Sequence, residues 1–187
     1  MKDRFSGAWM WCGCAVMAAL LYFPDSSWCG KIPQKGDSLP AMQLTAPSSE
    51  ADRLYLGIKG PTFKLQDVDA QVIVIEIIGV YCPHCYKQAP LFKNLFSRLE
   101  KGKYAGKVKM VGIAAGGTPE ELEYLREKGQ YNYPLVQDET FAVHKLLGEP
   151  KTPFTMLVDK KGKVHFAHLG IIEDIEALHD EIGKLVE

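Results

Sequence analysis

The segment QVIVIEII, residues 71–78, does most to narrow the folds open to this chain. Its β-branched residues favour an extended strand, and apolar residues at nearly every position are typical of a strand covered on both faces of a sheet. The sequence YCPHC follows at residues 81–85. Because proline is favoured in the first turn of a helix, we expect a helix to begin at Pro83. A buried strand is thus predicted to lead into a helix that carries two cysteines at its start.

Strands and helices are predicted to alternate along the rest of the C-terminal region. Thr118 and Glu121 form a capping box at the start of one helix, and Gly129 ends it. Two later strands flank the turn KKGK as an antiparallel hairpin, and an amphipathic helix follows. The expected strands are residues 71–78, 107–115, 154–159 and 164–169, and the expected helices begin near residues 83, 118, 139 and 173. This order predicts an α/β fold, with a mixed central sheet and helices on both faces.

The N-terminus differs in character from the rest of the chain. Two basic residues in MKDR precede an apolar run at residues 7–23, which is shorter than the roughly 20 residues of a membrane span. That order is typical of an export signal and less so of a buried soluble helix. We expect residues 1–29 to be a signal peptide or N-terminal membrane anchor. Residues 30–53, rich in Pro, Gly and Ser, are expected to be a linker, and residues 54–187 the folded domain.

Three of the five cysteines belong to the N-terminal segment. Cys12 and Cys14 fall within the apolar run, so we expect a mature exported protein to lack them. Cys29 is the odd thiol, which is removed, lipidated or left free near the membrane. The formal net charge of -1 gives no strong attraction to nucleic acid or anionic lipid. The remaining pair, Cys82 and Cys85, therefore carries most of the chemical information in the sequence.

Cys82 and Cys85 lie at positions i and i+3 of the predicted helix. Residues with that spacing share a helix face and lie about 5–6 Å apart, within the range that a disulfide spans. The unpaired N–H groups at a helix N-terminus stabilise a thiolate and lower its pKa. We therefore expect Cys82, at the exposed tip, to attack a disulfide of another protein, and Cys85 to resolve the mixed disulfide. Pro83 and His84, between them, are expected to tune the redox potential.

Other roles for a Cys-x-x-Cys pair fit the sequence less well. A structural disulfide across a two-residue gap closes a small loop, which constrains the unfolded chain little. A zinc or copper site needs further ligands, and the predicted domain has no second Cys-x-x-Cys and no His-x-x-x-His. Haem attachment requires a histidine directly after the second cysteine, where this chain has Tyr86. We therefore expect no metal and no cofactor.

One charged residue, Glu76, interrupts the apolar run. Burying a carboxylate costs free energy unless it has a partner or a role. Glu76 precedes Cys82 by six residues, so a strand that runs toward the helix start places it beneath the cysteine pair. A buried carboxyl has a raised pKa and exchanges a proton near neutral pH. We expect Glu76 to accept the proton of Cys85 during its attack, the alternative being an edge-strand residue that faces water.

These features resemble the thioredoxin fold, and in particular the exported TlpA/ResA-like thiol–disulfide oxidoreductases of the redoxin family. The resemblance runs from about Leu54 to the C-terminus, and it implies a thioredoxin-like three-layer sandwich. It also implies a cis-proline at Pro153, packed against the cysteines, with the backbone of Thr152 free to pair with a substrate strand. The residues that carry it are Cys82 to Cys85, the buried acid Glu76, Pro90 at a helix kink, the segment KTPFTMLVDKKGKV, Gly170, and the insertion GGTPEELEYLREKGQ.

The chain departs from this family at Tyr81, where a tryptophan is common before the first cysteine. Cys-Pro-His-Cys also occurs in DsbA-type oxidants, so a DsbA-like oxidase or isomerase is one alternative. A copper-binding metallochaperone on the same fold is another. Peroxiredoxins share the fold but have Thr or Ser three residues before the cysteine, and Gly79 at that position disfavours a peroxidase. The other histidines are expected to be surface or core residues; they are His144, His165, His168 and His179.

The resemblance implies a thiol–disulfide oxidoreductase of the periplasm or cell envelope. It would reduce disulfides of envelope proteins, for example in cytochrome c maturation. Its expected partners are client proteins with disulfides or thiols and a membrane thiol electron donor. The expected catalytic residues are Cys82, Cys85 and Glu76, and the expected substrate-binding and tuning residues are Tyr81, Pro83, His84, Thr152 and Pro153.

Overall fold

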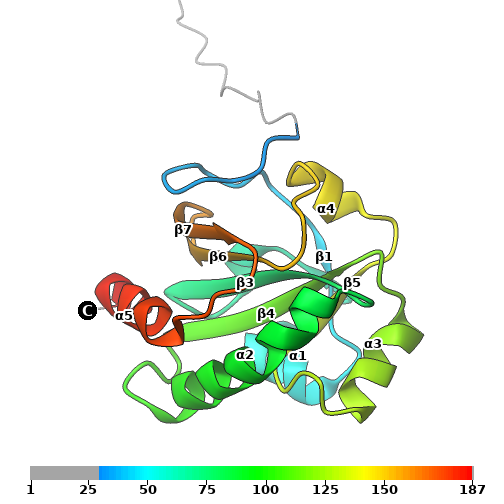
Figure 1. The fold of residues 1–187 in the computed structure, drawn as a ribbon, viewed down its shortest axis with the longest axis horizontal. Coiled ribbons are helices and arrows are strands. Elements are labelled where there is room, and N and C mark those ends of the chain that lie inside the picture. The colour runs from blue at the N-terminus through cyan, green and yellow to red at the C-terminus, as the bar shows by residue number, and fades with distance from the viewer. Residues whose placement is uncertain (1–29, 187) are drawn as a thin grey trace, which may run out of the picture.

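The computed structural model describes residues 30–186 (Figure 1). In chain order the elements are β1 Leu44–Thr45, α1 Glu50–Leu56, β2 Thr62–Phe63, a short 3₁₀ helix Leu65–Asp67, β3 Val72–Gly79, α2 Pro83–Lys101, β4 Val108–Ala115, α3 Pro119–Glu127, β5 Leu135–Asp138, α4 Ala142–Leu146, β6 Phe154–Asp159, β7 Val164–Leu169 and α5 Ile175–Val186. None of the helices within residues 30–186 is long and apolar enough to cross a membrane. The predicted export signal, with Cys12, Cys14 and Cys29, lies outside the described residues.

A five-stranded mixed sheet, in the order β5-β4-β3-β6-β7, forms the centre of the fold. β3 is parallel to β4 and β4 to β5, while β6 runs antiparallel to both β3 and β7. In Figure 1, α2, α3 and α5 lie on one side of this sheet and α4 on the other. The arrangement confirms the predicted α/β sandwich with helices on both faces of a mixed sheet.

The central strand β3 is buried on both faces, as its apolar run predicted. Successive side chains of a strand point to opposite faces of the sheet. The apolar residues at even positions, such as Val74, join a core with α2, α3 and α5. Those at odd positions, such as Ile75, join a second core with α1, α4 and the N-terminal segment. Glu76 belongs to the even-numbered face, so its carboxyl group lies on the side that α2 covers.

Residues 30–53 are packed against the domain, whereas their composition predicted a loosely attached linker. Met42 and Leu44 are only 4% and 1% exposed and belong to the second core. The Gly36 N–H donates to the Val164 carbonyl at 2.8 Å, which attaches the segment to β7. The strand in this segment, β1, is only two residues long. So short a strand cannot be recognised in the sequence from an alternation of apolar and polar residues. The folded unit therefore begins before Leu54.

Two further elements were absent from the expected order. α1 begins at Glu50, where the Ser49 side chain caps it by accepting from the Asp52 N–H. β5 is a four-residue strand at the edge of the sheet, paired in parallel with β4. Both are shorter than the windows over which hydrophobic periodicity is reliable. β5 matters for the site, because it follows two tyrosines that reach the face of the sheet beneath α2.

Candidate active site

Cys82 and Cys85 lie at the start of α2, where the sequence predicted them. Cys82 is the N-cap residue, and its sulfur accepts a hydrogen bond from the Cys85 N–H at 3.3 Å. Pro83 takes the first helical position, where its missing N–H leaves no bond unmade. Both cysteines are free thiols, Cys82 half-buried and Cys85 fully buried. The spacing thus gives one accessible and one protected sulfur on the same turn.

The pKa values of the two thiols are shifted in opposite directions. Partial burial acts to raise the pKa of Cys82, but hydrogen bonds to its thiolate hold the pKa below the ordinary value of 9.0; they come from the Cys85 and Thr152 side chains and the N–H groups of Cys85 and His84. Burial, together with the neighbouring Cys82 sulfur, raises the pKa of Cys85 to about 12. Since the thiolate is the attacking species, Cys82 is the reactive sulfur at neutral pH. Cys85 needs a proton acceptor before it can attack.

Thr152 and Pro153 lie beside the cysteine pair, just before β6, and are joined by a cis peptide bond. The Cys82 thiol donates to the Thr152 carbonyl oxygen at 3.4 Å. Gly79 makes this close approach possible, because a Cβ there would lie 3.2 Å from Thr152 Oγ1 and 3.3 Å from Cys82 Cβ. The resemblance implied the cis bond and the packing. It also implied that the Thr152 backbone is free to pair with a substrate. In this structure, with both cysteines as thiols, the Thr152 carbonyl oxygen accepts a hydrogen bond from the Cys82 thiol.

Glu76 is fully buried in the central strand β3, on the face of the sheet that α2 covers. Its Oε1 accepts from Gln88 Nε2 at 2.7 Å, and its Oε2 accepts from the Tyr133 hydroxyl. Burial raises the pKa of Glu76 from 4.5 to about 7, although both hydrogen bonds act to lower it. A carboxyl group with that pKa takes up or releases a proton near neutral pH. The alternative of an edge-strand residue facing water is wrong, since β3 is the central strand.

Sequence reasoning missed Gln88 and Tyr133, the two residues that hold Glu76. Gln88 Oε1 also accepts from the Ile172 N–H at 2.7 Å, so this fully buried amide bridges Glu76 and the chain before α5. Tyr133 reaches Glu76 across β4, where Gly112 stands opposite Glu76 and leaves space for the ring. The sequence held a signal for Gln88, because it is a polar residue three positions after Cys85 and so lies on the same, buried face of α2. Tyr133 precedes a strand that the pattern did not predict.

Tyr81 and His84, predicted to tune the site, both face solvent. Tyr81 is 78% exposed, and its hydroxyl donates to Glu121 Oε1 at 2.7 Å. This contact joins the turn before α2 to the capping box of α3. The exposed His84 acts on the Cys82 thiolate through its backbone N–H. The contacts that lower the pKa of Cys82 therefore come from the Cys85 and Thr152 side chains and from the backbone N–H groups of Cys85 and His84.

The other histidines contact groups away from the cysteine pair. His144 and His168 each lie within hydrogen-bond distance of a backbone carbonyl oxygen, at 3.0 and 3.2 Å. His165 Nε2 lies 2.9 Å from Asp159, and the His179 ring packs on Tyr104. Within residues 30–186, no group of three or more His, Cys, Asp or Glu side chains is arranged to hold a metal ion.

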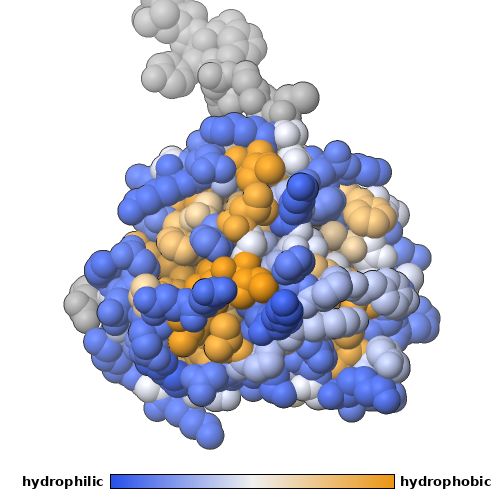
Figure 2. Space-filling model, viewed as in Figure 1, coloured by the Kyte–Doolittle hydropathy of each residue, from blue (hydrophilic) through white to orange (hydrophobic). Residues whose placement is uncertain are grey.

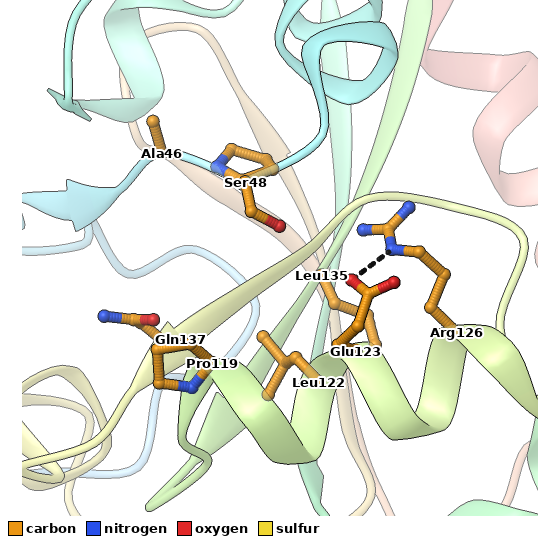
Figure 3. A pocket seen from close by; sticks show the side chains of 9 residues that line it. Ala46, Ser48, Pro119, Leu122, Glu123, Arg126, Leu135 and Gln137 are labelled. Atoms are coloured by element: carbon orange, nitrogen blue, oxygen red, sulfur yellow. Dashed lines mark ion pairs between the residues drawn. The ribbon is translucent and has the colours of Figure 1, made fainter.

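Hollows on the surface differ in their relation to the cysteines. The cavity in Figure 3 measures about 210 Å³ and lies between α3, β5 and residues 46–48. Two of the residues that line it form an ion pair, with Arg126 Nε 3.7 Å from Glu123 Oε2. None of the predicted site residues lines it. Figure 2 shows apolar side chains gathered over the region between β7 and α5, where another hollow lies. A further hollow adjoins the cysteine pair and is lined by Val80, Tyr81, Tyr86, Glu120, Glu121 and Tyr124.

Comparison with known proteins agrees with this fold. The family model described as AhpC/TSA matches residues 35–167. The thiol-disulfide oxidoreductase ResA of Geobacillus kaustophilus is 25% identical over 138 residues, covering 73% of this chain and 75% of the relative. ResA of Halalkalibacterium halodurans is 21% identical over 131 residues, covering 70% of each chain. The family match begins inside the segment predicted as a linker, in agreement with its packing.

Solved structures show the same fold. A candidate DsbE thiol:disulfide interchange protein from Chlorobium tepidum superposes with a TM-score of 0.64 at 21% identity, covering 82% of this chain and 99% of that one. StoA from Bacillus subtilis gives a TM-score of 0.57 at 17% identity, covering 76% and 96%. Fold, cysteine pair and curated relatives together define a thiol–disulfide oxidoreductase. The chain belongs to the AhpC/TSA family.

Proposed function

We propose that this protein is an exported oxidoreductase that reduces disulfides of cell-envelope proteins through Cys82 and Cys85. The observation that carries the proposal is the contrast between the two thiols. Cys82 is accessible and has a lowered pKa, whereas Cys85, three residues later, is buried and has a raised one. One sulfur is thus suited to attack a client, and the other is kept out of reach until the client is bound.

In the first step, the Cys82 thiolate attacks one sulfur of a client disulfide. The client S–S bond breaks, a bond forms between Cys82 and that sulfur, and the other client sulfur leaves as a thiolate. The hydrogen-bond donors at the start of α2 and the Thr152 side chain stabilise the attacking thiolate. The half-exposed position of Cys82 leaves its sulfur open to another protein.

In the second step, Cys85 loses its proton to Glu76 and attacks the Cys82 sulfur. The mixed disulfide breaks, a Cys82–Cys85 disulfide forms, and the second client sulfur leaves as a thiolate. Two electrons have then passed from the dithiol to the client. Glu76 suits the role of acceptor, because burial raises its pKa from 4.5 to about 7, which makes its carboxylate a stronger base than an ordinary one and leaves it partly ionised near neutral pH. Tyr133 and Gln88 hold its carboxyl group in place.

Direction and location are supported by different observations. The resemblance to TlpA/ResA-like oxidoreductases implies reduction, and a membrane thiol donor would then regenerate the dithiol; the ResA relatives support the thiol–disulfide chemistry itself. The basic start and apolar run of residues 1–29 favour an export signal or anchor, and so a place in the periplasm or cell envelope. Cytochrome c maturation is the process we propose for this activity. A DsbA-like oxidase would use the same two sulfurs in the opposite direction.

Insulin reduction tests the activity. The protein, supplied with dithiothreitol, should accelerate cleavage of insulin disulfides, and Cys82→Ala should abolish the acceleration. A Cys82→Ala variant as active as the wild type would contradict the proposal. Fusion of residues 1–35 to alkaline phosphatase, which is active only after export, tests the location. An inactive fusion that accumulates in the cytoplasm would rule out the export signal.

A further inference from the structure

The buried acid and the resolving thiol are not in direct contact. Both oxygens of Glu76 are occupied by Gln88 and Tyr133, and among the described residues no hydrogen bond joins Glu76 to Cys85. The Cys85 thiol instead interacts with Cys82, Thr152 and the backbone at Gly79. A proton that leaves Cys85 for Glu76 therefore needs a group that lies between them.

Tyr131 supplies a hydroxyl group in this region. The side chain is 5% exposed, and its oxygen has no hydrogen-bond partner, which is costly for a buried polar atom. Its ring packs edge-on against Tyr133, with centroids 5.5 Å apart, and it shares a buried cluster with Cys85. The charged groups that act on the hydroxyl are Glu76 first and Cys85 second, followed by Tyr86 and Cys82. The unpartnered hydroxyl thus lies in the neighbourhood of both the proton donor and the proton acceptor.

We propose that the Tyr131 hydroxyl, together with one bound water, relays the proton from the Cys85 thiol to Glu76. The inference rests on the proposed function, because it adds a residue to the second step. As Cys85 attacks, its proton enters this relay while another proton passes from the relay to the Glu76 carboxylate. The hydroxyl and the water are neutral before and after, so the balance of the step is unchanged: one S–S bond breaks, one forms, and Glu76 gains one proton.

Tyr131→Phe tests the relay, because it removes one oxygen and keeps the ring. The hydroxyl has no partner to lose, so the variant should fold and melt at the temperature of the wild type or above it. Thr155→Val is the matched control. Thr155 Oγ1 is also buried and without a partner, and Thr155 stands opposite Glu76 on the other neighbouring strand, β6.

The measurement is the rate at which a mixed disulfide with a model peptide resolves, followed by rapid mixing. We expect Tyr131→Phe to slow resolution about 10-fold or more, as for the loss of a proton-transfer group, with no change in formation of the mixed disulfide. The rate of the variant should keep rising with pH, since hydroxide must then remove the Cys85 proton. A purely structural effect would lower the rate by one factor at every pH, and that result would overturn the proposal.

The controls separate this inference from the proposed function. Unchanged resolution in Tyr131→Phe, with Cys82→Ala inactive, would overturn the relay and leave the oxidoreductase intact. Slow resolution in Thr155→Val with normal rates in Tyr131→Phe would place the route on the opposite side of Glu76 and also overturn it. Full activity of Cys82→Ala would overturn both.

Discussion

The sulfur of Cys82 lies 3.4 Å from the carbonyl oxygen of Thr152, seventy positions later in the chain. The contact brings the start of α2 against the start of β6, two elements that are far apart in the sequence. Thr152 acts on Cys82 twice, through this carbonyl when the sulfur is a thiol and through its side-chain hydroxyl when the sulfur is a thiolate. The reactivity of the cysteine pair therefore depends on a residue outside the Cys-x-x-Cys motif.

Thr152→Val should raise the pKa of Cys82, because the thiolate loses one of its hydrogen-bond donors. The ultraviolet absorbance of the thiolate, followed against pH, measures this pKa. At neutral pH the variant should react several-fold more slowly with a disulfide reagent. Thr152→Ser retains the hydroxyl and should titrate like the wild type. Identical titration curves for the valine and serine variants would show that the hydroxyl has no such effect.

Alkylation should distinguish the two thiols. With limiting iodoacetamide at neutral pH, Cys82 should be modified, since its pKa is lowered and its side chain is partly accessible. Cys85 should remain unmodified, because burial raises its pKa to about 12 and shields the sulfur. Peptide mapping by mass spectrometry reads the site of modification. Equal labelling of the two residues in the folded protein would contradict the assignment of roles.

Glu76 should make the stability of the reduced protein depend on pH. Its folded-state pKa of about 7 lies above its ordinary value of 4.5, so its contribution is fully present below the unfolded value and is lost as pH rises through 7. The loss in unfolding free energy should approach about 3 kcal/mol. Glu76→Gln cannot ionise and should lack this loss, becoming more stable than the wild type in alkaline solution. Urea unfolding across this pH range measures it, and parallel pH profiles would contradict it.

Leu44→Ala should destabilise the protein by roughly 2–5 kcal/mol, as for other large-to-small changes in a core. Leu44 is 1% exposed and belongs to the second core, although the sequence placed it in a linker. Leu54, 74% exposed, provides the control, and Leu54→Ala should change stability by less than about 0.5 kcal/mol. Denaturant unfolding compares the two. Two equally small effects would restore the linker interpretation.

The sequence predicted the parts of the fold that depend on local pattern. The β3 run, the proline after Cys82 and the capping box at Thr118 are each read within about one turn or one strand, and each lies where it was expected. The cysteine pair and Glu76 were found for the same reason, since a charged residue in an apolar run and two thiols at helical spacing are visible without a structure.

The remaining parts of the site depend on long-range packing. Tyr133 reaches Glu76 from a distance of 57 residues, across a strand where Gly112 leaves space for its ring. Tyr131 lies in the same segment of the chain, directly before β5. No periodic pattern marks these positions, because they belong to a short edge strand and its approach. The packed N-terminal segment was missed on similar grounds, since its contacts are made with β7, over a hundred residues later.

Trapping of a mixed disulfide tests the division of roles between Cys82 and Cys85 most directly. Each single variant is reduced, mixed with a peptide disulfide, quenched with acid and weighed by mass spectrometry. Cys85→Ala should accumulate a covalent adduct on Cys82, because nothing resolves it, and Cys82→Ala should form none. An adduct on Cys85 in Cys82→Ala, or no adduct in either variant, would contradict the assignment of Cys82 as the attacking sulfur.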